Sequence, residues 1–140
     1  MKKSSVSIDS SCLIALQANE ELGNRFKERA KQDWDVYCSE FAILETFYVL
    51  CRKFGIGIAE QKVTSLKESG VIQIEPIITL SKDAALIKCQ RPIAIGDCFT
   101  IALARKINGD AIFCKKEQEL KKALDKQPFD VNVLFFEDLI

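Results

Sequence analysis

The 140-residue sequence predicts a three-layer α/β/α sandwich around a mostly parallel central sheet. Short β-branched runs alternate with longer segments of helical periodicity along the whole chain, as expected for strands joined by crossover helices. Glycine, proline or asparagine separates many of these segments, where turns are expected. No internal repeat, low-complexity tract or linker interrupts the alternation, so we expect residues 1–140 to form a single domain.

The amino-terminal part of the chain reads as strand, helix, helix and strand. Valine and isoleucine alternate with serine over Ser5–Ile8, which predicts the first strand. Ser10–Ala18 follows with closely spaced leucine and isoleucine, which favours a helix. Glu20–Lys31 is polar with two apolar residues four positions apart, so we expect a solvent-facing amphipathic helix. Trp34–Cys38 is the second expected strand.

The middle of the chain is expected to hold further helices around a third strand. Ser39 can cap a helix that runs to about Lys53, and Gly55 and Gly57 are expected to break it. Glycine and proline bound the segments that follow, of which the strand alternates apolar and polar residues. These segments are a helix at Ile58–Ser69, a strand at Val71–Glu75 and a helix at Ser81–Cys89.

The carboxy-terminal part of the chain completes the alternation. Asp97–Ile107 is a strongly apolar helical segment, ended by Asn108 and Gly109. Ala111–Cys114 reads as a buried strand, Glu117–Leu124 as a charged helix and Val131–Phe135 as the last strand.

Composition narrows the class of protein. The 20 Lys and Arg residues equal the 20 Asp and Glu residues, so any contact with nucleic acid must rest on a local patch rather than on net charge. No segment approaches the ~18 apolar residues that a membrane span needs. The basic residues at the start precede a short strand-like run and not a signal peptide, so we expect a cytoplasmic protein.

Six cysteines and no histidine are present, and no two cysteines form a CxxC pair. A zinc site of mixed cysteine and histidine ligands is therefore excluded. We expect reduced thiols in the core, and a structural disulfide is the alternative. The cysteines are Cys12, Cys38, Cys51, Cys89, Cys98 and Cys114.

Three carboxylates each stand alone in a long uncharged stretch. Asp9 is the only charged residue in 4–19, Glu45 in 41–51 and Asp97 in 92–104, although 29% of the chain is charged. A buried carboxylate costs several kcal/mol unless it is paired or bound to a cation. If the fold brings these acids together, a divalent metal would relieve their repulsion.

Each acid also has a purely structural interpretation. Asp9 and Asp97 each stand at the expected start of a helix and could be N-caps. Glu45 lies inside its helix on the apolar face, where it could pair with a buried Arg or Lys.

Three short segments surround these acids. They are Ser7-Ile8-Asp9-Ser10-Ser11-Cys12-Leu13, Ile43-Leu44-Glu45-Thr46-Phe47-Tyr48 and Gly96-Asp97-Cys98-Phe99-Thr100-Ile101-Ala102-Leu103-Ala104. In order, spacing and chain length they resemble the acidic motifs of PIN domains. The resemblance covers essentially the whole chain and implies a Mg²⁺- or Mn²⁺-dependent ribonuclease. Many small members are VapC-type toxins, so it also implies RNA as substrate, an antitoxin protein as partner and a homodimer.

Carried over by position, the resemblance makes Asp9, Glu45 and Asp97 the catalytic and metal-binding acids, with Ser11 supporting Asp9. Relatives usually carry a fourth acid in a Thr-x-Asp pattern after the next strand. This chain reads Cys114-Lys115-Lys116-Glu117 there, so Glu117 is the expected substitute.

Other charged residues near the fourth motif are weaker candidates. Glu119 is a second choice for the fourth acid, and Asp110 lies at the amino end of its strand, on the wrong edge of the sheet. Lys115 and Lys116 could hold backbone phosphates, or could be solvated residues at the start of a charged helix.

Two other functions remain open from sequence. A non-catalytic PIN-like module that binds RNA or protein would also explain the altered fourth motif. A phosphatase or phospho-acceptor domain is disfavoured, because Asp9-Ser10-Ser11 lacks the second aspartate of a DxD motif.

Overall fold

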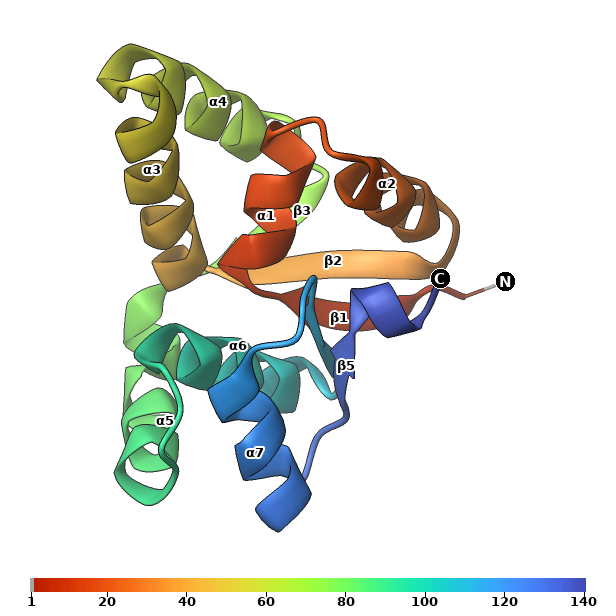
Figure 1. Ribbon diagram of the computed structural model, residues 1–140, viewed down its shortest axis with the longest axis vertical. Helices are drawn as coiled ribbons and strands as arrows, with labels where there is room; N and C mark the ends of the chain where they lie inside the picture. Colours follow the sequence, from red (N-terminus) through yellow and green to blue (C-terminus); the bar gives the residue numbers. More distant parts are fainter. Residues whose placement is uncertain (1) are drawn as a thin grey trace.

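The computed structural model describes residues 2–140, and over that range the chain forms one five-stranded parallel sheet with helices on both faces (Figure 1). The predicted α/β/α sandwich with a parallel sheet is confirmed. The strand order is β3-β2-β1-β4-β5, and every neighbouring pair is parallel. The strands are β1 (Ser4–Ile8), β2 (Trp34–Ser39), β3 (Ile72–Glu75), β4 (Asp110–Phe113) and β5 (Val133–Phe135).

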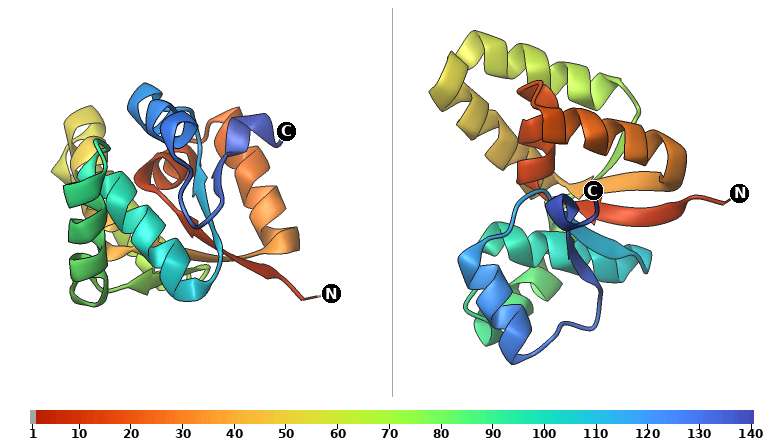
Figure 2. Two further views of the ribbon diagram at one scale, coloured as in Figure 1. Left: turned by 90° about the horizontal axis from the view of Figure 1, so that it is seen from below. Right: turned by 45° about the vertical axis from the view of Figure 1, so that its right-hand side comes forward.

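The helices form two layers (Figures 1 and 2). One layer holds α1 (Ser10–Gln17), α2 (Glu21–Asp33), α3 (Glu40–Phe54) and α4 (Ile56–Glu68). The other holds α5 (Ile77–Gln90), α6 (Ile95–Ile107) and α7 (Gln118–Lys126). A short 3₁₀ turn, η1 (Phe136–Asp138), follows β5 near the carboxyl terminus.

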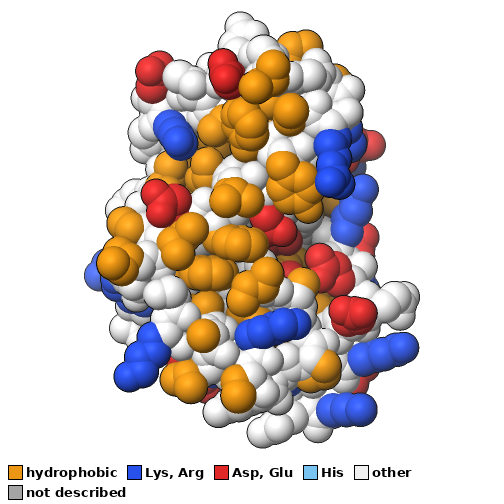
Figure 3. Space-filling model, turned by 90° about the vertical axis from the view of Figure 1, so that its left-hand side faces the viewer, with side chains coloured by type: hydrophobic (Ala, Val, Ile, Leu, Met, Phe, Trp, Pro, Cys, Tyr) orange, Lys and Arg blue, Asp and Glu red, His pale blue; other side chains and the backbone are white. Residues whose placement is uncertain are grey.

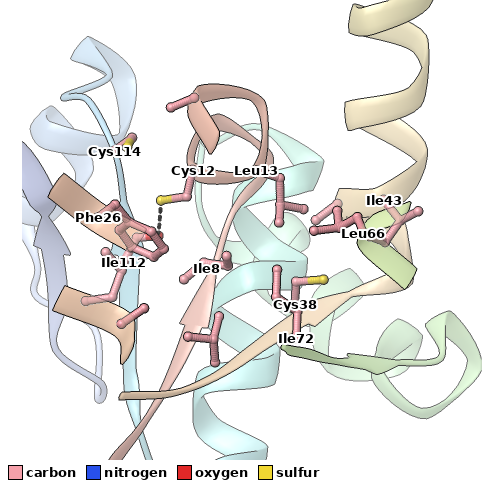
Figure 4. Packing of buried hydrophobic residues seen from close by; sticks show 14 of the residues in the cluster. Ile8, Cys12, Leu13, Phe26, Cys38, Ile43, Leu66, Ile72, Ile112 and Cys114 are labelled. Carbon is pink, nitrogen blue, oxygen red and sulfur yellow. Dashed lines mark hydrogen bonds between the residues drawn. The ribbon is translucent and has the colours of Figure 1, made fainter. Parts of the chain in front are cut away.

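Each layer has its own apolar core against the sheet. In the first core, Ile8, Cys38 and Ile112 project from three adjacent strands toward Cys12 and Leu13 of α1 (Figure 4). The core on the other face is built largely from α6, whose residues from Gly96 to Ala104 are all buried. A helix buried on all sides fits the long apolar stretch in the sequence.

Several helix boundaries differ from those predicted. Helix α5 begins at Ile77, because Pro76 takes the N-cap position and the apolar residues after it are already helical. Helix α6 begins at Ile95, two residues before Asp97. Gly55 alone makes the turn between α3 and α4, with φ of 92°, and Gly57 lies inside α4. Positive φ strains residues with a Cβ, so only Gly55 acts as the break.

The cysteines are reduced, as the sequence predicts. Throughout residues 2–140 every cysteine is a free thiol, and Cys12, Cys38, Cys98 and Cys114 are buried. Burial raises the pKa of the Cys38 thiol to about 12. In the described part of the chain, none of the helices combines the length and apolar character needed to cross a membrane.

Candidate metal centre

The acids meet at the carboxyl edge of the sheet. Asp9 directly follows β1, and its backbone N–H donates to Ile112 O of β4 at 3.3 Å. Asp97 lies in the first turn of α6, and Glu117 precedes α7. One carboxylate oxygen from each of Asp9, Asp97 and Glu117 falls within 4.8 Å of the others. Parallel strands end at the same edge, which explains why distant segments converge there.

Asp9 is held by Ser11. The Ser11 hydroxyl donates to Asp9 Oδ1 at 2.7 Å and accepts the Cys114 backbone N–H at 3.0 Å. Asp9 occupies the N-cap position of α1 without making a side-chain capping bond. Ser11 therefore ties the first acid to the loop that carries Glu117.

Asp97 is deeply buried, and one of its carboxylate oxygens lacks a donor within residues 2–140. It is 4% exposed, and its Oδ2 is buried with no hydrogen-bond partner among residues 2–140. Ala94, not Asp97, is the N-cap of α6, so the capping interpretation of Asp97 is wrong. A buried carboxylate oxygen without a donor costs free energy, and a cation is the partner that its charge requires.

Glu45 lies beside the group rather than within it. It is half-buried on α3, where Ser10 Oγ lies 3.4 Å from Glu45 Oε1. No ion pair to Glu45 occurs within residues 2–140, so the structural interpretation with a buried Arg or Lys finds no support. Gly96 faces this carboxylate, and a Cβ built there would lie 3.0 Å from Glu45 Cδ and still closer to Oε1.

The raised pKa values of these carboxyl groups indicate that they favour bound protons or a bound cation. Burial, together with the nearby Glu117, Asp9 and Glu45 carboxylates, raises the pKa of Asp97 to about 9. Burial also raises the pKa of Asp9 to about 6, against the stabilising hydrogen bond from Ser11. The pKa of Glu45 is raised by burial too, with the Ser10 hydroxyl acting the other way. An oxygen-only set of close carboxylates with one unpartnered oxygen fits Mg²⁺ or Mn²⁺.

The weaker candidates from the sequence, two acids and two lysines, lie outside the group of Asp9, Asp97 and Glu117. Glu119 lines a hollow between α7 and the segment that follows α5, which includes Arg91. Asp110 accepts a hydrogen bond from Asn132 at 3.2 Å, at the start of β4. Lys115 is exposed, and Lys116 Nζ pairs with Asp138 Oδ1 at 3.0 Å.

Sequence reasoning missed three residues that shape the site. Ser10 bonds Glu45, Gly96 makes room for it, and Glu137 bonds the loop before Glu117. Glycine directly before Asp97 was a visible signal for a close approach. Nothing in the local sequence of Glu137 points to the site, because its partner lies in another segment of the chain.

Comparisons with known proteins give a family and several similar folds. A family model described as PIN domain matches residues 6–125. The fold is similar to VapC20 of Mycobacterium tuberculosis, described as a toxin that cleaves the sarcin–ricin loop, with a TM-score of 0.66 and 20% identity over 84% of this chain and 94% of that one.

Two further solved structures are similar. A toxin–antitoxin complex from Klebsiella pneumoniae matches with a TM-score of 0.61 and 12% identity, covering 88% of this chain and 92% of that chain. DNA-bound VapBC from Salmonella typhimurium matches with a TM-score of 0.66 and 9% identity, covering 96% and 99%. A search of curated proteins found no match. At these identities the similar structures establish the fold alone.

Proposed function

The chain belongs to the PIN-domain family, and from that premise we propose that it is a Mg²⁺- or Mn²⁺-dependent endoribonuclease, the toxin of a toxin–antitoxin pair. The observation that carries the proposal is the group of Asp9, Asp97 and Glu117, with oxygens within 4.8 Å and one buried oxygen unpartnered within the described chain. Clustered carboxylates that raise one another's pKa are typical of functional sites. RNA is the substrate class that the family relationship favours.

Each residue has a distinct part in this proposal. Asp9, Asp97 and Glu117 would hold the ion, which when bound supplies Lewis acidity and a more acidic water. Ser11 orients Asp9 through its 2.7 Å hydrogen bond. Glu45 is half-buried beside this group, where Ser10 Oγ lies 3.4 Å from its Oε1, and would act on the substrate side.

Two lysines were candidates for phosphate contacts. Lys115 is exposed, two residues before Glu117, and remains the candidate. Lys116 is held by Asp138 and would have to leave that ion pair to reach a phosphate. An exposed ion pair of this kind contributes only about 0–1 kcal/mol, so substrate could displace it.

The proposal is tested by incubating purified protein with RNA in Mg²⁺, Mn²⁺ or EDTA. We expect cleavage with either metal and none in EDTA. Glu45→Gln is expected to lower cleavage by about 100-fold, while its melting temperature without metal stays equal or rises, because one of several repelling charges is removed. Intact RNA under all conditions would favour the non-catalytic PIN-like module instead.

We also propose an antitoxin protein as partner and a homodimer as the assembly. The similar structures include a toxin–antitoxin complex and a VapBC complex. Figure 3 shows hydrophobic side chains surrounding acidic ones on the face where α3, α4 and α5 lie, which suits protein contacts. A lysine or arginine of the partner could enter the acidic group and replace the charge of the metal. The large exposed hydrophobic residues of α3 to α6 are Leu44, Tyr48, Phe54, Ile56, Ile58, Ile78, Leu86 and Ile95.

Co-expression tests the partner. Expression of this chain alone should arrest growth. Co-expression of a short open reading frame found to adjoin its gene should restore growth and yield a purified complex. The matched control is Glu45→Gln, which should leave growth unaffected while still binding the partner. Normal growth with the unaltered chain, expressed to the same level, would contradict the toxin proposal.

A further inference from the structure

The loop that carries Glu117 has no regular structure of its own. Residues 114–117 connect β4 to α7, and Lys115, Lys116 and Glu117 are all exposed. Yet the carboxylate of Glu117 lies among those of Asp9 and Asp97, which repel it. An exposed, negatively charged side chain on an irregular loop would turn toward solvent unless other contacts held the loop in place.

At its start, the loop is held by the site itself. The Cys114 backbone N–H donates to Ser11 Oγ at 3.0 Å, and Cys114 is buried. This contact lies three residues before Glu117 and leaves the rest of the loop unconstrained from that side.

Nearer to Glu117, the loop is held from the carboxyl-terminal turn η1. The Glu137 backbone N–H donates to Cys114 O at 3.3 Å, and Glu137 Oε1 accepts the Lys116 backbone N–H at 2.9 Å. Glu137 thereby spans the loop and bonds the residue directly before Glu117. A carboxylate that accepts a backbone N–H makes a charge-assisted hydrogen bond, which is stronger than a neutral one.

The turn that carries Glu137 is itself fixed in the core. Phe136, the preceding residue, is completely buried. Its ring packs edge-on against Phe26 at 5.2 Å and Trp34 at 6.1 Å between centroids. Glu137 itself is exposed, but the buried ring of Phe136 fixes the turn that carries it. A residue that positions another must itself be held in place in this way.

We propose that Glu137 is a positioning residue that holds Glu117 within the carboxylate group and so sets the affinity of the site for a divalent ion. This inference rests on the proposed metal-dependent function. It explains how a chain without the usual Thr-x-Asp pattern still places a fourth acid at the site. Glu137 does this from the opposite end of the sequence, by hydrogen bonding and not by ligating.

The test is the affinity of the purified full chain for Mn²⁺, measured from the electron paramagnetic resonance signal of free Mn²⁺. Glu137→Ala is expected to weaken binding by about 10-fold, in the range of losses seen when a supporting residue of a metal site is removed. Glu137→Gln keeps an oxygen acceptor and should retain most of the affinity. Asp138→Asn is the matched control and should leave the affinity unchanged, because the carboxylate of Asp138 pairs with the side chain of Lys116 and not with the loop backbone.

A double-mutant cycle separates positioning from a general effect on folding or charge. In a Glu117→Gln background, Glu137→Ala should cause no further loss of Mn²⁺ affinity, because the residue through which it acts is gone. Melting temperatures without metal should stay close to that of the unaltered protein, since water can solvate the exposed Lys116 N–H.

Three results would overturn the inference. They are an unchanged affinity in Glu137→Ala, an equal loss in both backgrounds, and a Glu137→Gln variant as weak as Glu137→Ala. Absence of Mn²⁺ binding by the unaltered chain would instead refute the proposed metal-dependent function, so the two failures are distinguishable.

Discussion

The metal-free protein is expected to lose stability as the pH rises from about 5 to about 9, and Mg²⁺ is expected to reverse that loss. The folded-state pKa is raised to about 9 for Asp97 and to about 6 for Asp9. In an unfolded chain both aspartates would have a pKa of about 3.9. Between these values the folded state holds protons that the unfolded state has released, so the free energy of unfolding falls as pH increases.

Melting temperature in EDTA, followed by circular dichroism across this pH range, measures the effect. A decrease of at least about 4 °C is expected, which corresponds to roughly 1 kcal/mol for a domain of this size. Saturating Mg²⁺ at about 100 times its dissociation constant would add about 2.7 kcal/mol. Because Mg²⁺ requires ionised ligands, this gain should be largest at high pH.

Asp97→Asn is the matched control for this pH dependence. The variant lacks the carboxyl group with the largest raised pKa, so its melting temperature in EDTA should change much less with pH. It should also lose the gain from Mg²⁺. A melting temperature of the unaltered protein that is flat or rises with pH would contradict the buried carboxylate cluster.

Gly96→Ala is expected to lower RNA cleavage by about 100-fold, the size of loss that a displacement near 1 Å can cause. The added Cβ would collide with the carboxylate of Glu45, which must turn away from the site. The collision is with the end of a flexible side chain, so the fold should survive. Replacing glycine by alanine in a helix interior is worth about 1 kcal/mol, and Gly96 lies in the first turn of α6, so a smaller gain is expected and the variant should be at least as stable as the unaltered protein.

Gly57→Ala provides the control for this substitution. Gly57 is also helical, and among the described residues no atom lies within 4 Å of the Cβ it would gain. It should raise the melting temperature and leave cleavage unchanged. Equal activity in the two glycine variants would show that the position of Glu45 does not matter for cleavage.

The sequence alone was sufficient to predict the architecture of this protein. Alternating strand and helix patterns produce a parallel sheet because parallel neighbours require crossover helices. The sequence also indicated that Asp9 and Asp97 lie at one edge of the sheet. Asp9 directly follows the first strand, and Asp97 lies near the start of an apolar helix, so the direction of each element fixes the edge. Helix starts were less predictable, since the apolar residues after Pro76 fit a helix or a loop equally well.

Only the tertiary structure decided how the candidate acids are arranged and what holds them. It placed Glu117, the expected fourth acid, in the group with Asp9 and Asp97, and left Glu45 beside them. It also revealed the space left by Gly96 and the link from Glu137 to the loop. Such contacts join residues far apart in the chain, so the local pattern of apolar and polar residues does not predict them. Their geometry arises only when the two helical layers and the carboxyl-terminal turn pack against the same edge of the sheet.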